Sequence, residues 1–224
     1  MKVHRLRSQP FDVNAWLVEC GRGEWLLADA TTGADFPLVQ QQLASTGIDP
    51  RSIKAIWCSH YHCDHCGGAA HFHDLTGAPV YLHEMEADAV RTGDSRATLG
   101  AFVGLTQRPC PVEGLREGSE LRVGDRVFQV LHLPGHTAGH TALYDPASKD
   151  LFSGDLVFEM GSFGRVDFPT GDAKALVRSL ERLAALDLGA IYPGHMDPLI
   201  GTDARDGLEA SLRNLDFMLE SGQL

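Results

Sequence analysis

The stretch that decides the fold reads Ser59-His60-Tyr61-His62-Cys63-Asp64-His65-Cys66-Gly67-Gly68. Within six residues it contains three imidazoles and one carboxylate, at positions i, i+2, i+4 and i+5. Neutral imidazole and carboxylate are the ligands of Zn²⁺, Fe and Mn in catalytic sites that keep an open coordination position. A polar loop that is merely rich in histidine is the alternative. Four ligand-type residues at this spacing, followed by a Gly-Gly turn, favour a metal site.

The residues before this loop, 53–58, favour a β-strand. Side chains alternate along a strand, so a strand that ends here directs His60 and His62 to the same side. Beyond the strand end the chain turns, and Asp64 and His65 can face a second point in space. The sequence therefore predicts two neighbouring metal ions rather than one.

Length and charge limit the function classes. The chain has 224 residues, of which 43% are hydrophobic, and this predicts a single domain over residues 1–224 with a large core. A net charge of −11 argues against nucleic acid as a partner, because binding to phosphates requires Lys and Arg. The first residues contain no apolar stretch behind their charges, and no window is apolar enough for a membrane span. We expect neither a secretory signal nor a membrane partner.

Cysteine usage predicts a reducing compartment. The five cysteines are an odd number with irregular spacing, which is typical of a cytoplasmic protein. Cys63 and Cys66 form a C-x-x-C pair, but the histidines around it do not belong in a thioredoxin-like redox motif. A zinc ribbon needs a second cysteine pair, which the other three cysteines do not supply. We expect Cys63 and Cys66 to line the wall of the loop.

Strands and helices alternate in the same order in both halves of the chain. Strands are predicted at residues 3–6, 14–18, 25–28, 53–58, 80–82, 120–123, 126–133, 141–144, 150–153 and 190–192. Helices are predicted at 36–44, 69–75, 84–92 and 172–186, with a closing helix that carries leucines from 208 to 219. This order predicts an α/β fold in which two sheets pack together and helices cover the outer faces. The segment Gly93–Gly118 is predicted to roof the site or to form a dimer contact, an ordinary surface excursion being the alternative.

Three further strand ends place a ligand-type residue beside glycine. They are Pro134-Gly135-His136-Thr137-Ala138-Gly139-His140, Ser153-Gly154-Asp155 and Tyr192-Pro193-Gly194-His195. Glycine at a strand end lets the backbone approach a metal without a side-chain clash. Together with the histidine loop, these positions provide enough ligands for two sites.

The order of these ligands resembles the metallo-β-lactamase superfamily. That resemblance rests on His60-x-His62-x-Asp64-His65 followed by His140, Asp155 and His195, and it implies a four-layer αβ/βα sandwich. It implies that the first metal is held by His60, His62 and His140, and the second by Asp64, His65 and His195, with Asp155 as the bridge. His136 lies on the same turn as His140 and competes for the ligand role. The resemblance favours His140 and leaves His136 to shape the loop.

Within that superfamily the chain resembles the short, single-domain glyoxalase II-like hydrolases. This narrower resemblance rests on the stretches 152–158 and 164–172 around and after Asp155. It implies two divalent metal ions, most simply Zn²⁺ with Fe or Mn as alternatives, that activate water to cleave a small-molecule thioester. Asp64 and Asp155 would be the catalytic carboxylates. Arg165 is the candidate substrate-binding cation, and an ion pair with a neighbouring Asp is the alternative for it.

Rival functions come from the same and other classes. A mononuclear iron persulfide dioxygenase and a lactonase would share much of the ligand set. A non-catalytic metal-binding module would need closed coordination, which two sites with this ligand count do not favour. A secreted β-lactamase is disfavoured because no signal peptide is expected, and a nuclease is disfavoured by the acidic charge. A serine hydrolase is disfavoured because no G-x-S-x-G motif is present.

Overall fold

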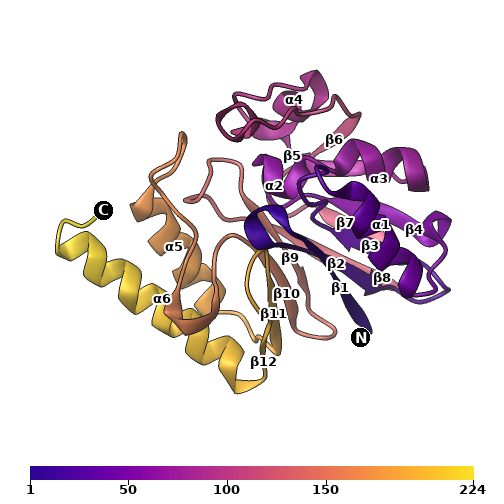
Figure 1. The fold of residues 1–224 in the computed structure, drawn as a ribbon. Coiled ribbons are helices and arrows are strands. Elements are labelled where there is room, and N and C mark those ends of the chain that lie inside the picture. Colours follow the sequence, from indigo (N-terminus) through magenta and orange to yellow (C-terminus); the bar gives the residue numbers. More distant parts are fainter.

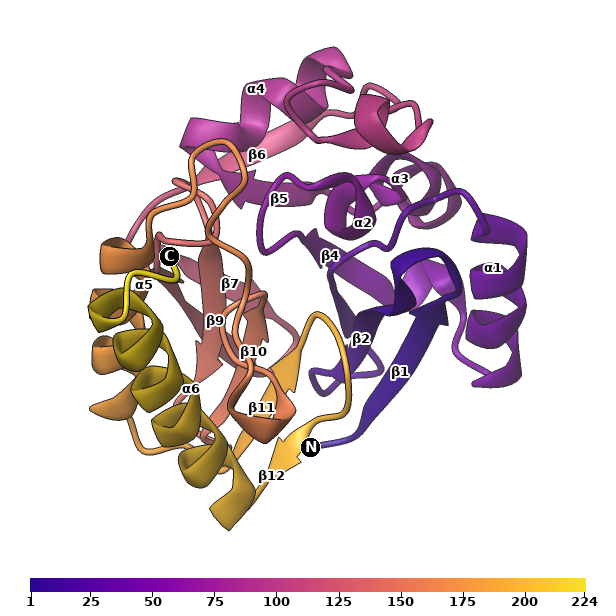
Figure 2. The same cartoon turned by 60° about the vertical axis from the view of Figure 1, so that its left-hand side comes forward.

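Two six-stranded β-sheets pack face to face, and helices cover the outer face of each sheet (Figures 1 and 2). The computed structural model describes all 224 residues. The predicted four-layer α/β sandwich is therefore confirmed. None of the helices combines the length and the apolarity that a bilayer crossing requires.

The first sheet has the strand order β1-β2-β3-β4-β5-β6. Its strands are β1 Val3–Ser8, β2 Val13–Glu19, β3 Trp25–Ala28, β4 Ile53–Trp57, β5 Val80–His83 and β6 Val112–Leu115. The first three strands are antiparallel and the last four are parallel. Its helices are α1 Phe36–Ser45, α2 Cys63–Cys66, α3 Ala69–Thr76 and α4 Glu84–Thr92, with 3-10 turns at η1 Pro10–Asp12, η2 Pro50–Ser52 and η3 Gly100–Val103.

The second sheet has the strand order β12-β11-β10-β9-β8-β7. Its strands are β7 Glu120–Val123, β8 Arg126–His132, β9 Thr141–Asp145, β10 Asp150–Gly154, β11 Ala190–Pro193 and β12 Leu199–Ile200. Only β10 and β11 are parallel; the other neighbours are antiparallel. The turn η4 Glu159–Gly161 follows β10, and the helices α5 Ala173–Ala184 and α6 Thr202–Glu220 cover the outer face.

Alternation along the strands separates three hydrophobic cores. In β2, Leu17 faces the helices of the first half, while Trp16 and Val18 face the second sheet. This is the period-2 pattern of a strand that is buried on both faces. On the far side of the second sheet, leucines of α5 and α6 pack against β9, β10 and β11. One core lies between the sheets and one lies under each helical layer, which is why four layers are stable together.

The segment 93–118 contains more regular structure than the sequence indicates. Val112–Leu115 forms β6, which pairs in parallel with β5 at the edge of the first sheet. This strand has only four residues, includes Gly114, and carries two exposed residues between two buried ones. So short a strand has no clear alternation of its own, and it forms because β5 offers it a pairing edge.

The carboxyl ends of β4, β10 and β11 lie at one end of the sandwich. There, Asn14 donates from its backbone N to the carbonyl oxygen of Gly194 at 2.7 Å, which joins the first sheet to the loop after β11. Thr141 donates from its backbone N to the carbonyl oxygen of Ser59 at 2.8 Å, which joins β9 to the loop after β4. These backbone bonds bring the predicted ligand loops together.

Candidate metal centre

Three buried histidines direct one ring nitrogen each to a common point. His60 Nε2 lies 3.0 Å from His62 Nδ1 and 3.2 Å from His136 Nε2, and the last two atoms are 3.0 Å apart. His60 and His62 follow β4, whereas His136 lies in the loop between β8 and β9. Such spacing suits three ligands of one metal ion, whose bonds to histidine nitrogen are about 2.0–2.1 Å long.

The partners of the opposite ring nitrogens fix which atoms carry protons. His136 donates from Nδ1 to the carbonyl oxygen of Arg165 at 2.6 Å. The Ser59 hydroxyl donates to Asp29 and lies 3.0 Å from His60 Nδ1, so His60 donates to that hydroxyl. The Nε2 atoms of His60 and His136 therefore carry no proton, and their lone pairs face each other. The two lone pairs repel each other unless a cation lies between them. Burial lowers the pKa of His136, which favours its neutral, ligating form.

A second cluster consists of Asp64, His65 and His195. Asp64 Oδ2 lies 3.6 Å from His65 Nε2 and 3.4 Å from His195 Nε2. His65 Nδ1 lies 2.9 Å from Asp29 Oδ2, so a buried carboxylate orients this ring as it does in many metal sites. Burial opposes a charge on His195, but contacts with Asp155 and Asp64 raise its pKa to about 10.

Asp155 lies between the two clusters. Its Oδ2 is 3.6 Å from His136 Nε2 and 3.5 Å from His195 Nε2, while its Oδ1 is 3.3 Å from His65 Nε2. Burial alone would raise the pKa of Asp155, but the imidazoles of His65 and His195 hold it well below its usual range. Asp155 Oδ1 and His65 Nε2 are buried and have no hydrogen-bond partner. These unpartnered atoms, with imidazoles and carboxylates as the only donors, fit divalent Zn, Fe or Mn.

His140 does not join either cluster, and this placement differs from the role as a ligand of the first metal that the resemblance implies. Its Nε2 accepts a hydrogen bond from the backbone N of Asp155 at 3.1 Å. The ring stacks on that of His60, with centroids 5.1 Å apart. His140 directly precedes β9, so the pairing of this strand determines its position. His136 occupies the predicted place of His140. His140 instead holds the backbone of Asp155.

A cavity of about 600 Å³ opens above the two clusters. The candidate ligands His62, Asp64, His136, Asp155 and His195 form part of its lining. Its walls are mostly apolar and include Phe11, Leu99, Phe102, Val103, Phe158, Phe163, Phe168 and Pro169. Leu99, Phe102 and Val103 belong to the segment 93–118, so this segment contributes a wall of the cavity. Cys63 also lines the cavity and all five cysteines are free.

Arg165 forms the ion pair that was the alternative made from the sequence, and its role in substrate binding stays a prediction. It lines the cavity, and its Nε and Nη2 donate to Asp167 at 2.9 and 2.6 Å. Its guanidinium lies 4.4 Å above the ring of Phe168. The side chain is thus both paired and placed beside the site.

Comparison with known proteins identifies the family. A family model described as the Metallo-beta-lactamase superfamily matches residues 8–195, which include every candidate ligand. The chain belongs to the metallo-β-lactamase superfamily.

Similar members of the metallo-β-lactamase superfamily include two named enzymes. The chain is 34% identical over 210 residues to the acyl-coenzyme A thioesterase MBLAC2 of Gallus gallus. The alignment covers 82% of this chain and 72% of that protein. It is 34% identical over 206 residues to the hydroxyacylglutathione hydrolase of Pseudomonas aeruginosa, covering 87% of this chain and 64% of that protein. The chain thus spans less than two thirds of the latter enzyme. The superfamily and these names indicate a hydrolase.

Among solved structures of the superfamily, the chain is similar to TTHA1623 in a di-iron-bound form. The two are 36% identical with a TM-score of 0.75, over 94% of this chain and 96% of that chain. A divalent metal site in this chain is consistent with the likeness.

Two buried acids that support the ligand loops were not predicted as site residues. Asp29 lies at the end of β3, next to β4, and accepts from the backbone N of Ser59 at 2.7 Å while its other oxygen faces His65. Glu86 accepts from the backbone N of Tyr61 at 2.9 Å and from that of Gly139 at 2.8 Å. The sequence signal for Asp29 is an acid that closes a buried strand beside the histidine loop.

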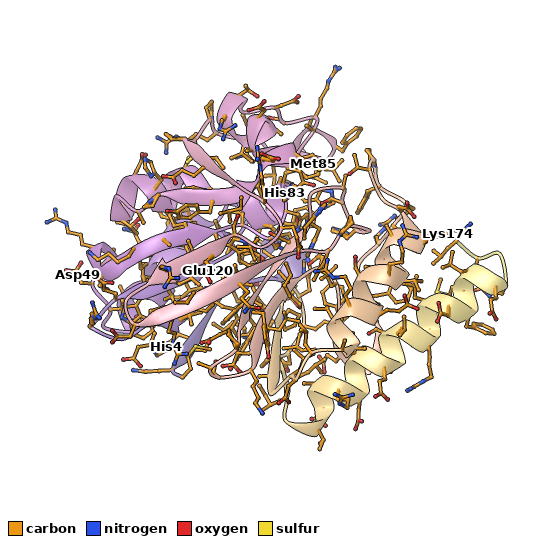
Figure 3. The ribbon with its side chains drawn as sticks, turned by 180° about the vertical axis from the view of Figure 1, so that it is seen from behind. His4, Asp49, His83, Met85, Glu120 and Lys174 are labelled. Carbon is orange, nitrogen blue, oxygen red and sulfur yellow. The ribbon has the colours of Figure 1, made fainter.

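Glu86 ties the two loops of the first cluster together from α4. That helix begins after His83, whose Nδ1 accepts from the backbone N of Met85 at 3.4 Å (both labelled in Figure 3). Burial raises the pKa of Glu86 to about 7, although its hydrogen bonds act in the opposite direction. Its sequence signal is an acid on the face of α4 that also buries Ala87 and Val90.

Proposed function

We propose that this chain hydrolyses thioesters at a centre of two divalent metal ions. In this proposal His60, His62 and His136 hold the first ion, and Asp64, His65 and His195 hold the second. The observation that carries the proposal is the position of Asp155, whose Oδ2 lies 3.6 Å from a nitrogen of the first set and 3.5 Å from one of the second. A carboxylate that reaches both ligand sets is the feature expected of a shared, two-ion site.

Two such ions would supply a water of lowered pKa and an electrophile for a carbonyl oxygen. The side chains of the protein arrange the rest. Asp155 lies between the two ligand sets, Asp64 lies against His65 and His195, and Asp29 holds the ring of His65 through its Nδ1. With a substrate bound, the phenylalanines of the cavity would reduce its contact with bulk water, which strengthens electrostatic interactions.

A thioester suits the groups that line the cavity. Besides the candidate ligands, the titratable side chains of the lining are Cys63 and Arg165. Burial raises the pKa of Cys63 to about 11, and Arg165 stays charged, so neither is matched to protonating a leaving group near pH 7. A thiolate leaves with little protonation. Both named relatives, a hydroxyacylglutathione hydrolase and an acyl-coenzyme A thioesterase, carry thioester substrates in their names.

Zinc is our first choice of metal, and iron or manganese would satisfy the same ligands. The di-iron form of a similar structure makes iron the main rival. The five free cysteines support the cytoplasmic location expected from their spacing.

The test combines metal analysis of the purified protein with a panel of thioesters, lactones and persulfides. We expect two metal equivalents per chain and thiol release from thioesters. If the protein binds one iron per chain, consumes oxygen when given a persulfide and does not hydrolyse thioesters, it is a persulfide dioxygenase and this proposal is wrong. Lactone hydrolysis without thioester turnover would replace it with a lactonase.

The variant Asp155→Ala should bind less than two equivalents and lose nearly all turnover. The exposed Asp216 on α6 provides a matched control, because Asp216→Ala removes the same group far from the site. Two bound metals and full activity in Asp155→Ala would refute the assignment of Asp155.

A further inference from the structure

Five phenylalanine side chains surround the space above the candidate metal ligands. They are Phe11, Phe102, Phe158, Phe163 and Phe168. Phe11 belongs to the turn η1 between β1 and β2, Phe102 to the segment 93–118, and the other three to the loop that connects β10 with α5. Three parts of the chain that are distant in sequence therefore contribute aromatic walls to one cavity. Such a wall recognises apolar surface.

The same cavity offers little to a polar, charged substrate. Its one cation outside the candidate ligands is Arg165, which pairs with both carboxylate oxygens of Asp167 and lies over the ring of Phe168. A glutathione group brings two carboxylates and an ammonium group into the site. Charged groups that leave water without a partner cost free energy, so this lining disfavours recognition through glutathione.

Apolar side chains continue to the mouth of the cavity and are exposed there. Phe102 is 76% exposed, Phe11 49% and Val103 47%. Exposed apolar side chains that line an apolar cavity are typical of a surface that a ligand covers. An alkyl chain whose thioester carbonyl lies at the candidate metals would run along this wall and cover these side chains.

We infer that the substrates are thioesters whose acyl part is an apolar chain of several carbons. This inference rests on the proposed thioester hydrolysis and narrows it. The acyl chain lies against the phenylalanine wall, and the thiol part of the substrate contributes little to recognition. Each methylene that moves from water to this wall should raise kcat/KM about three- to fourfold until the wall is covered.

The first test varies only the acyl part. The metal-loaded enzyme is given acetyl, butanoyl, hexanoyl and octanoyl thioesters of N-acetylcysteamine, and release of the thiol is followed. We expect kcat/KM to rise by at least a hundredfold from acetyl to octanoyl. A flat series, or one that falls with chain length, would overturn the inference while leaving thioester hydrolysis intact.

The second test varies only the thiol part, with lactoyl thioesters of glutathione and of N-acetylcysteamine. Similar kcat/KM values, within about threefold, are expected. A preference for the glutathione thioester of thirtyfold or more would show that the thiol is recognised and would overturn the inference.

The wall itself is tested by Phe102→Ala. The ratio of octanoyl to acetyl kcat/KM should fall about tenfold or more, whereas the matched variant Phe217→Ala, which removes an exposed ring of α6, should leave the ratio unchanged. Light scattering gives the oligomeric state of both variants, and so distinguishes a contact of Phe102 with the acyl chain from a contact between two copies of the protein. If Phe102→Ala dissociates a dimer without changing the ratio, the rim is an interface between copies and the inference fails.

Binding without turnover separates the inference from the proposed function. Alkyl thioethers of N-acetylcysteamine, in which CH₂ replaces the thioester carbonyl, are titrated calorimetrically. If no thioester is hydrolysed but the octyl thioether binds much more tightly than the ethyl one, the proposed function fails and the apolar site stands. Equal affinities for the two thioethers would contradict the inference of an apolar acyl-chain site.

Discussion

His136 donates from its ring Nδ1 to the carbonyl oxygen of Arg165 at 2.6 Å. The nitrogen on the other side of this ring is the one that faces His60 and His62. One side chain therefore connects the first ligand set to the loop that carries Phe163, Arg165 and Phe168 into the cavity wall. The position of the wall and the orientation of the ligand depend on each other.

Gly164 is the residue that allows this connection. A Cβ at Gly164 would lie 2.0 Å from the carbonyl oxygen of Asp155 and 3.1 Å from His136 Nδ1. We expect Gly164→Ala to displace the loop and to lower metal affinity about 10–100-fold, as the loss of a ligand's outer hydrogen bond does. Competition with a chelator measures the affinity. Gly189→Ala is the control because its added Cβ would meet only ordinary contacts, and equal affinities in the two variants would contradict the prediction.

Asp29 holds His65 in position and should control the second metal. In Asp29→Asn, one side-chain atom can still accept from the backbone N of Ser59, but the carboxylate partner of His65 Nδ1 is lost. We expect one of the two metal equivalents to bind about 10–100-fold more weakly. The neighbouring Asp35 contacts Ser8 and not the site, so Asp35→Asn should bind both equivalents normally. Unchanged stoichiometry in Asp29→Asn at limiting metal would exclude this role.

Glu86 should make stability depend on pH. Its pKa is about 7 in the folded protein against 4.5 for the ordinary group, so the folded state holds this proton more tightly than the unfolded state. The resulting stabilisation is complete below about pH 4.5 and is lost as the pH rises through 7, a change of about 3 kcal/mol. Urea unfolding from pH 5 to 8 with a chelator present should show a steeper fall in wild type than in Glu86→Gln. Parallel curves would contradict the prediction.

Removal of metal should destabilise the whole fold. Seven ionisable side chains meet at the site, and three of them, His62, His65 and Asp155, have buried atoms without a hydrogen-bond partner. An ion present at 1,000 times its dissociation constant stabilises the folded state by about 4 kcal/mol. Thermal unfolding should therefore shift to lower temperature with a chelator and recover with Zn²⁺, Fe²⁺ or Mn²⁺. A transition that does not respond to any of these ions would argue against ligation.

The elements, and the clustering of most of the candidate ligands, were predictable because their signals are local. The strand predicted at residues 14–18 and the helix predicted at 172–186 correspond closely to β2 and α5. Within 60–65, the split between His60 with His62 and Asp64 with His65 agrees with the two clusters of the structure. Each of these patterns lies within one element or one loop.

No local sequence signal distinguishes His136 from His140 as the candidate ligand. Both are histidines beside glycine on one turn, and their spacing does not tell which ring faces the site. The difference arises from contacts with distant residues. Arg165 holds the ring of His136, while the backbone of Asp155 engages that of His140. Asp29 and Glu86 were missed for the same reason, since their partners lie in loops that strand pairing brings near Asp29 and that packing of the two sheets brings near Glu86.

Asn14, bonded to Gly194, joins an early strand to a loop near the other end of the chain. Val13 also forms an isolated bridge with His195, the last candidate ligand. During synthesis on the ribosome the first sheet and the histidine loop emerge well before His195 is translated. The first ligand set, which His136 completes, is therefore translated before the second set, which also needs His195. Under the proposed two-ion function, the second ion would therefore be bound after the first.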